Sequence, residues 1–426
     1  MKIHLDSIGC RLNQSEIETM ARQFRAAGHE IVAQAAGAEL AVVNTCAVTA
    51  DAAADSRQLI RHLARAGVGQ IIPTGCWTTL QMKEAASLPN VLKVVSNLQK
   101  DDLVSEFNSE SKIPNLEFET EPLARQPLPG LQRRTRAFIK AQDGCDNACT
   151  FCVTTVARGA ARSRPLAEVI EDVNFALAGG VKEIALTGVH LGAWGQERGI
   201  HLRDLVKAIL DQTDAPRLRL SSLEPWDLDA DFFRLWENPR LMPHLHLPLQ
   251  AGSESTLKRM ARKTTPASFR ALLAAARTVI PEAAITTDII AGFPAETEEE
   301  FAETLEFVRE MGFAGGHVFT YSPRPGTAAS RMRGQIRLEV RKRRNRILRE
   351  ALAESAKVYR RKFVGRKMSA LWESVTELND RGWQMEGWTE NYLRVRAAAF
   401  SPRWNEVDEV ELVEAGEEGM KGRLVT

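Results

Sequence analysis

The sequence has few cysteines, little net charge and no long hydrophobic run. Six cysteines among 426 residues are too few for a disulfide framework, so metal ligation or catalysis is their expected role in a reducing cytosol. No apolar stretch reaches the roughly 18 residues that a membrane-spanning helix needs. The first residues, MKIHLDSIGC, resemble a strand and not a secretion signal. We therefore expect a cytoplasmic protein without a membrane partner.

Length and composition predict a globular protein of several domains. A chain of 426 residues corresponds to two to four domains of roughly 100–200 residues each. The hydrophobic fraction of 44% is ordinary and permits a sizeable core. The formal net charge of only +1 conceals segments of strong local charge.

Three cysteines stand close together in the segment DGCDNACTFC. Cys145, Cys149 and Cys152 have the spacing C-x3-C-x2-C and follow a short strand-like run. Three thiolates from one loop can hold three corners of a cubane iron–sulfur cluster, and without a fourth cysteine nearby the fourth iron stays open to a small chelating ligand. The alternative is a structural zinc site or a set of core cysteines. Zinc usually has a fourth Cys or His ligand, and His190 is too far along the chain to belong to this loop.

The other three cysteines each end an apolar, strand-like run in the first hundred residues. Cys10, Cys46 and Cys76 close the segments KIHLDSIGC, ELAVVNTC and GQIIPTGC. Helical patterns follow them at Asn13–Ala27, Ala50–Ala66 and Thr78–Ala86, and this alternation predicts a parallel sheet. The carboxyl ends of parallel strands meet at one edge of the sheet, so we expect the three thiols to converge there as ligands of a second cluster. Three unrelated buried thiols are the alternative.

The middle of the chain predicts a partial barrel of six βα units after a linker. Ser105–Gly130 is rich in proline and glutamate, which disfavours regular structure. Strand candidates from 137 to 321 alternate with helical patterns, and a full eight-stranded barrel would need about 250 residues. Barrel chemistry is carried by strand carboxyl ends, where ordinary caps or turns are the alternative interpretation. The polar candidates at these ends are Thr187, Gly188, Ser222, Glu224, Gln250 and Asp288.

A basic amphipathic helix is predicted after the barrel. Arg331–Lys367 contains 15 Lys/Arg and 3 Glu, an excess of +12. The densest part is Arg341, Lys342, Arg343 and Arg344, which we interpret as an RNA-binding stripe that contacts phosphates. A solvated charged face is the alternative.

The tail predicts a small β-barrel. From Val364 onward short strand patterns alternate with turn signals, and four of the eight tryptophans lie there. Small barrels of this kind bind nucleic acids through basic grooves and stacked aromatic rings. For any single tryptophan, a place in the barrel core is the alternative.

Taken in order, the motifs resemble those of the radical-SAM methylthiotransferase family. They cover nearly the whole chain: IGCRLNQSE, NTCAVT, PTGC, DGCDNACTFC, ARGAARSRP, SSLEP, HLPLQAGSESTLKRMARK, TDIIAGFPAETEEEF and GWTENYLRVR. The resemblance implies an α/β protein with a parallel N-terminal domain (1–104), a linker (105–130), a radical-SAM core that includes the basic helix (131–362) and a TRAM-like RNA-binding barrel (363–426). It also implies two [4Fe-4S] clusters, one on Cys10, Cys46 and Cys76, and one on Cys145, Cys149 and Cys152 with S-adenosyl-L-methionine at its open iron. The six polar candidates would then contact S-adenosyl-L-methionine.

The resemblance further implies a tRNA-modifying enzyme. NTCAVT and GWTENYLRV are similar to the branch that methylthiolates C2 of N6-threonylcarbamoyladenosine at position 37, in the anticodon loop of tRNA. A 5′-deoxyadenosyl radical would activate the adenine, and an electron donor and a sulfur donor would be partners. The alternatives are N6-isopentenyladenosine-37, an aspartate of a ribosomal protein, and a non-catalytic iron–sulfur RNA-binding protein.

Overall fold

The computed structural model describes residues 1–110, 135–380 and 382–425. The chain forms two compact units: residues 1–147, 152–180 and 187–189 in the first, and 148–151, 181–186 and 190–426 in the second. No helix of these described residues combines the length and the apolar character needed to cross a membrane.

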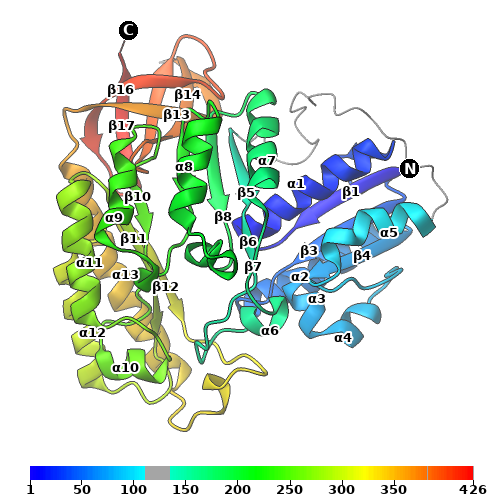
Figure 1. Ribbon diagram of the computed structural model, residues 1–426, viewed down its shortest axis with the longest axis horizontal. Helices are drawn as coiled ribbons and strands as arrows, with labels where there is room; N and C mark the ends of the chain where they lie inside the picture. Colours follow the sequence, from blue (N-terminus) through cyan, green and yellow to red (C-terminus); the bar gives the residue numbers. More distant parts are fainter. Residues whose placement is uncertain (111–134, 381, 426) are drawn as a thin grey trace. The chain divides into compact units, whose positions relative to one another are not determined.

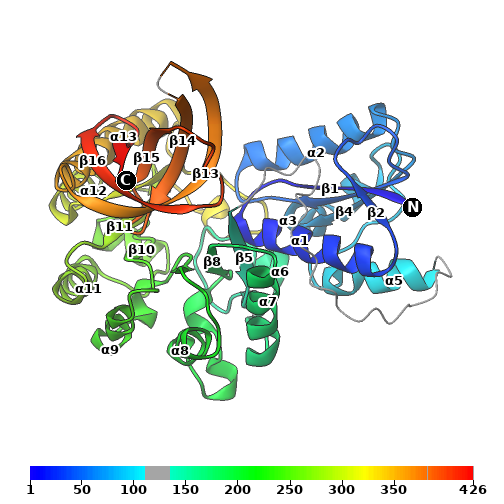
Figure 2. The same ribbon diagram turned by 90° about the horizontal axis from the view of Figure 1, so that it is seen from above.

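The first unit is built on a four-stranded parallel sheet, as predicted. The strand order is β2-β1-β3-β4, with β2 a short strand that the sequence did not indicate. Strand β3 (LAVVNT) is buried on both faces: Leu40 and Val42 face α1 and α5, while Ala41 and Val43 face α2 and α3 (Figure 2). A continuous apolar run is what a parallel strand covered on both sides requires. The elements are β1 (Lys2–Ser7), α1 (Arg11–Ala26), β2 (Glu30–Val32), β3 (Leu40–Thr45), α2 (Ala50–Arg65), β4 (Gln70–Gly75), α3 (Cys76–Leu80), α4 (Met82–Ala86), η1 (Lys100–Asp102) and α5 (Leu103–Glu110).

Two predictions in this unit need correction. The helix expected at Thr78–Ala86 is two short helices, α3 and α4, which meet at Gln81. The first residues of the predicted linker belong to helix α5, because Leu103, Val104 and Phe107 are buried in the sheet core and stabilise the helix. The rest of that linker prediction lies almost entirely outside the described residues, so the domain boundaries there remain a prediction.

The six βα units of the middle segment are confirmed (Figure 1). Strands β10, β11 and β12 form a parallel sheet, on which α13 packs, and β8 pairs in parallel with β9. Threonine caps begin α11 and α12, where Thr265 and Thr297 each form a capping box with the residue three positions on. The elements are β5 (Arg136–Lys140), β6 (Gln142–Asp143), α6 (Thr154–Arg158), β7 (Arg162–Ser163), α7 (Leu166–Ala178), β8 (Glu183–Thr187), η2 (Leu191–Ala193), η3 (Gln196–Arg198), α8 (Leu202–Gln212), β9 (Leu218–Leu220), η4 (Pro225–Asp227), α9 (Ala230–Phe233), η5 (Arg234–Glu237), β10 (His244–His246), α10 (Glu254–Arg259), α11 (Pro266–Val279), β11 (Ala284–Ala291), α12 (Glu298–Met311), β12 (Gly315–Thr320), η6 (Ala329–Arg331) and α13 (Leu338–Arg361).

The tail is a closed five-stranded barrel, also as predicted, within the second unit. Its strand order is β13-β14-β15-β17-β16. Trp372 is fully buried in its core and donates its indole N–H to Asp408, so this tryptophan has the core role. Trp388 instead stacks on Tyr392, whose other stacking partner is His244 of β10. The strands are β13 (Lys367–Asn379), β14 (Gly382–Thr389), β15 (Arg394–Ala399), β16 (Val407–Ala415) and β17 (Met420–Leu424).

Candidate iron–sulfur and tRNA sites

Cys10, Cys46 and Cys76, here called the N-terminal triad, follow three adjacent parallel strands. They come after the carboxyl ends of β1, β3 and β4, which are neighbours in the sheet. Two glycines bring the backbone close to these thiols. Gly9 has φ +110°, and a Cβ there would lie 2.6 Å from Cys46 Cβ and 2.8 Å from its Sγ. Gly75 has φ +95°, and a Cβ there would lie 2.4 Å from the carbonyl oxygen of Thr45. Only glycine fits at either position.

The donor chemistry of the N-terminal triad suits an iron–sulfur cluster. Burial raises the pKa of Cys46 to about 11, so this thiol becomes a thiolate at neutral pH only when a metal replaces its proton. Among the described residues, no three His, Cys, Asp or Glu side chains are grouped as ligands of a single metal ion. A cubane does not need that grouping, because each cysteine binds a different iron.

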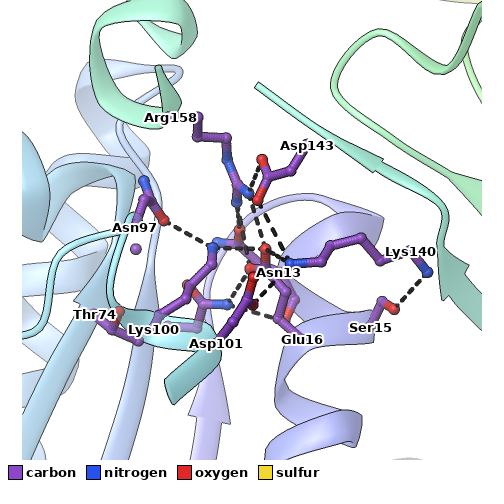
Figure 3. Close-up of polar contacts among 12 residues, drawn as sticks. Asn13, Ser15, Glu16, Thr74, Asn97, Lys100, Asp101, Lys140, Asp143 and Arg158 are labelled. Carbon is purple, nitrogen blue, oxygen red and sulfur yellow. Dashed lines mark hydrogen bonds and ion pairs between the residues drawn. The ribbon is translucent and has the colours of Figure 1, made fainter. Parts of the chain in front are cut away.

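A buried arginine of the same unit, Arg158, takes part in a network of charged and polar side chains (Figure 3). Arg158, at the end of α6, donates from Nε to Cys76 Sγ at 3.3 Å. Its Nη1 donates to Glu16 and to Asp143, both at 2.9 Å. Asn13 accepts from Nη2 at 2.8 Å. The guanidinium therefore connects Cys76 with helix α1 and with the strand that leads into the Cys145 loop.

Two lysines complete the network. Lys100 Nζ lies 2.6 Å from Glu16 and Lys140 Nζ lies 2.9 Å from Asp101. Burial opposes the charge of Glu16, yet the nearby Arg158, Lys100 and Lys140 outweigh it and hold the pKa of this carboxyl well below its ordinary value. Burial likewise disfavours the charged guanidinium, but its anionic neighbours, led by Glu16, raise the pKa of Arg158. The network therefore favours the charged forms of Glu16 and Arg158.

Cys145, Cys149 and Cys152, here called the loop triad, lie on the loop between β6 and α6, and all three are half-buried. In the first unit, the amide of Cys145 donates to the carbonyl of Gly159, and the amide of Asn147 lies 3.5 Å from Cys145 Sγ. Gly144 must be glycine, since a Cβ there would lie 1.8 Å from the carbonyl oxygen of Ala160. Partly accessible thiols with N–H donors nearby can serve as cluster ligands.

In the second unit, Cys149 lies beside a buried cation. Arg262 Nη1 lies 3.7 Å from Cys149 Sγ, and the same guanidinium makes a two-pronged ion pair with Glu224. The guanidinium also lies over the ring of Trp226, 4.5 Å from its centroid. Phe151 packs edge-on against Phe293 and fixes this part of the loop.

The six polar candidates fall into separate groups. In the first unit, Thr187 is buried, and its carbonyl oxygen accepts a hydrogen bond from the amide of Ala141. A Cβ added at Gly188 would lie 3.0 Å from Gln142 Oε1. In the second unit, Gln250 and Asp288 are neighbours: the amide of Gln250 donates to the carbonyl of Asp288 at 2.8 Å. Gln250 has φ +70°, an uncommon value for a residue other than glycine. Ser222 is exposed, and Glu224 is occupied by Arg262.

The predicted basic stripe needs a correction at Arg344. Its side chain is buried and pairs with Glu296 at 2.6 Å, so it is not available to a phosphate. Arg341 is half-buried against Gly292 and donates to the carbonyl of Tyr321. Lys342 and Arg343 are exposed, and Arg343 makes an ion pair with Glu298 at 2.9 Å, so their contact with phosphates remains a prediction.

Sequence reasoning missed the two cations beside the cysteine sulfurs. Arg158 belongs to the motif ARGAARSRP, and Arg262 belongs to the motif HLPLQAGSESTLKRMARK. Neither motif indicates which of its arginines is buried, because that depends on contacts far apart in the sequence. Sequence reasoning also missed the contact of His190 with Asp227, whose side chains lie 2.5 Å apart.

Comparisons with known proteins cover the same segments. The family described as the radical SAM superfamily matches residues 139–308, and uncharacterized protein family UPF0004 matches residues 2–96. The solved structure of TsrM, a radical S-adenosylmethionine methyltransferase from Kitasatospora setae, has a TM-score of 0.61 at 16% identity over 77% of this chain and 75% of that one, which is a likeness of fold.

Curated relatives match over almost the whole chain. Threonylcarbamoyladenosine tRNA methylthiotransferase MtaB of Thermotoga maritima is 36% identical over 98% of this chain and 96% of its own, and the protein of the same name from Bacillus subtilis is 32% identical over 98% and 95%. The tRNA-2-methylthio-N(6)-dimethylallyladenosine synthase of Novosphingobium aromaticivorans is 33% identical over 98% and 96%. The chain therefore belongs to the radical-SAM methylthiotransferase family.

Proposed function

We propose that this protein methylthiolates C2 of N6-threonylcarbamoyladenosine at position 37 of tRNA. The observation that carries the proposal is the match to the Thermotoga maritima methylthiotransferase, at 36% identity over 98% of the chain. The two cysteine triads support it, because one lies at the carboxyl ends of adjacent strands in the N-terminal sheet and the other on one loop of the radical-SAM segment.

The residues present fit two [4Fe-4S] clusters, one on each triad. The loop triad would hold the cluster that binds S-adenosyl-L-methionine, and the N-terminal triad would hold the auxiliary cluster. When bound, these groups supply reductive cleavage of the sulfonium and the sulfur that is transferred.

The chain's own contribution is to orient and shield these groups. Arg262 places a positive charge beside Cys149, where a thiolate ligand needs one, and Glu224 holds that guanidinium in position. Asp288, within β11, carries a carboxylate that pairs with His246, and Gln250, after β10, carries an amide; both groups suit the polar parts of S-adenosyl-L-methionine. The edge-on contact of the partly buried Phe151 with Phe293 holds one side of the loop against the core.

Fewer residues of the basic stripe remain candidates for contact with tRNA than the sequence suggested. Lys342 and Arg343 on α13 remain candidates for the tRNA backbone near the anticodon loop, together with the exposed Arg346 and Arg349. Arg344 is excluded by its buried ion pair. An electron donor and a sulfur donor are further partners that this chemistry needs.

A competition between substrates tests the proposal. Anaerobically reconstituted protein is given S-adenosyl-L-methionine, a sulfur source, dithionite and one of three substrates: tRNA carrying N6-threonylcarbamoyladenosine, tRNA carrying N6-isopentenyladenosine, or a ribosomal-protein peptide with the target aspartate. We expect methylthio product from the first alone, measured by mass spectrometry of nucleosides or peptide. Product from either of the others alone would move the protein to another branch. Binding of tRNA without any product would favour the non-catalytic iron–sulfur protein.

A further inference from the structure

All five N–H donors of Arg158 have acceptors. One of them, Nε–H, points to the sulfur of Cys76 at 3.3 Å, and the other four face Glu16, Asp143 and Asn13. A guanidinium is the only side chain that can present five donors in such a fork. The Cys76 sulfur accepts a second hydrogen bond from Asn97 Nδ2 at 3.5 Å.

The network contains one more positive charge than negative charges. Its members are the buried cations Arg158 and Lys100, the partly buried cation Lys140, and the buried anions Glu16 and Asp143. The two lysines balance the two carboxylates. At the rim, Asp101 and Arg162 are more exposed and cancel one another. A thiolate at Cys76 is the one further anion in contact with the guanidinium, and it would make the buried group neutral.

The three cysteines of the N-terminal triad are not equivalent in this respect. The sulfur of Cys10 lies near the amide of Asn13, and that of Cys46 near the amide of Val48, and both donors are neutral. Among the contacts found for the described residues of this triad, only Cys76 accepts a hydrogen bond from a cationic side chain. Hydrogen bonds to ligand sulfurs are one of the factors that set the reduction potential of an iron–sulfur cluster.

We propose that Arg158, assisted by Asn97, is a positioning residue that orients the Cys76 sulfur as a ligand and raises the reduction potential of the N-terminal cluster. The inference rests on the proposed function, in which the N-terminal triad holds a [4Fe-4S] cluster. One-electron reduction adds a negative charge to the cluster and its thiolates. A cationic donor aimed at one of those sulfurs stabilises the reduced form more than the oxidised form.

The test uses full-length protein in which the loop triad is changed to Ala, so that only the N-terminal cluster contributes to the spectra. Iron per chain is measured first, and then the midpoint potential of the cluster by dithionite titration followed by EPR. The variants are Arg158→Gln, Arg158→Lys and Asn97→Asp, which replaces the amide donor by an acceptor of the same shape. Arg22→Lys is the control, because Arg22 makes an ion pair with Asp172 in the same unit.

We expect about four irons per chain in the parent. Arg158→Gln should lower the ratio of reduced to oxidised cluster at fixed potential at least tenfold, which is about 59 mV for one electron. Asn97→Asp should shift it in the same direction, Arg158→Lys should fall between Gln and the parent, and Arg22→Lys should not shift it. If Arg158→Gln does not fold, Arg158→Lys decides, because it keeps the positive charge and removes the Nε–H donor to Cys76.

Two results would overturn the inference in distinguishable ways. Four irons with an unchanged potential in both Arg158→Gln and Asn97→Asp would refute the role of these donors and leave the proposed function intact. A parent protein without iron would refute the N-terminal cluster itself.

Discussion

Replacing Gly9 by Ala should remove the N-terminal cluster and spare the other one. Gly9 has φ +110°, and an added Cβ would lie 2.6 Å from the Cβ of Cys46 and 2.8 Å from its sulfur. The Cβ of Cys46 is attached directly to the backbone after β3, so it cannot move away without shifting the strand end. A natural control exists in Gly28, which has φ +81° but nothing within 4 Å of an added Cβ.

Gly9→Ala and Gly28→Ala both incur the cost of a positive φ, but only Gly9→Ala also incurs a cost of overpacking. A positive φ costs an L-residue about 1–2 kcal/mol, so this term applies to both Gly9→Ala and Gly28→Ala. Overpacking a fixed site adds roughly 1–3 kcal/mol, and only Gly9→Ala incurs it. Since about 1.4 kcal/mol is a factor of ten, the overpacking term alone disfavours the ligand geometry by roughly 5-fold to 140-fold.

The assay is iron content with product analysis after anaerobic reconstitution. The parent and Gly28→Ala should hold about eight irons, two cubanes of four, and Gly9→Ala about four. Gly9→Ala given dithionite and S-adenosyl-L-methionine should still form 5′-deoxyadenosine but no methylthio product. Eight irons and full methylthiolation in Gly9→Ala would refute this view of the N-terminal triad.

Four further predictions concern individual sites in the two units. Cys46→Ala should form 5′-deoxyadenosine without methylthio-adenosine in tRNA, and full methylthio product would make its triad structural. Changing Lys342 and Arg343 to Ala should weaken tRNA binding and reduce the log–log salt slope by about 1 to 2, and an unchanged slope would mean a merely solvated face. Arg344→Ala should instead cost roughly 3–5 kcal/mol of stability by leaving Glu296 buried and unpaired, measurable as a lower urea midpoint. Glu183→Ala should cost a similar amount, about 3–5 kcal/mol, because two buried arginines would lose their carboxylate, and a midpoint equal to wild type would contradict this.

The placement of the N-terminal cysteines could be predicted because it follows from a general rule of parallel sheets. Each of the runs ending at Cys10, Cys46 and Cys76 is a strand, and the three strands are neighbours in the order β1-β3-β4. The order itself was not needed, since all carboxyl ends of a parallel sheet lie on one edge.

The error at Arg344 shows what a charge count cannot supply. Arg344 stands four positions before Leu348 and eight before Leu352, and the structure buries all three on one face of α13. The helical period held this information, because residues spaced by four share a face. The net excess of +12 gives the number of charged side chains but not which of them face the protein interior.

The contact between Arg158 and Cys76 lay beyond sequence reasoning. The two residues are 82 positions apart, and their hydrogen bond depends on how α6 packs against α3. No periodicity or spacing encodes such a contact. The same limit applies to Arg262 and Glu224, which are 38 positions apart.

The most direct test of the proposed function is nucleoside mass spectrometry of tRNA from cells with and without this gene. Deletion should abolish 2-methylthio-N6-threonylcarbamoyladenosine, and N6-threonylcarbamoyladenosine should accumulate in its place. The wild-type gene should restore the methylthio nucleoside, and a Cys46→Ala gene should not. The proposed function would be contradicted if the deletion strain kept its level of 2-methylthio-N6-threonylcarbamoyladenosine and lost a different methylthio product.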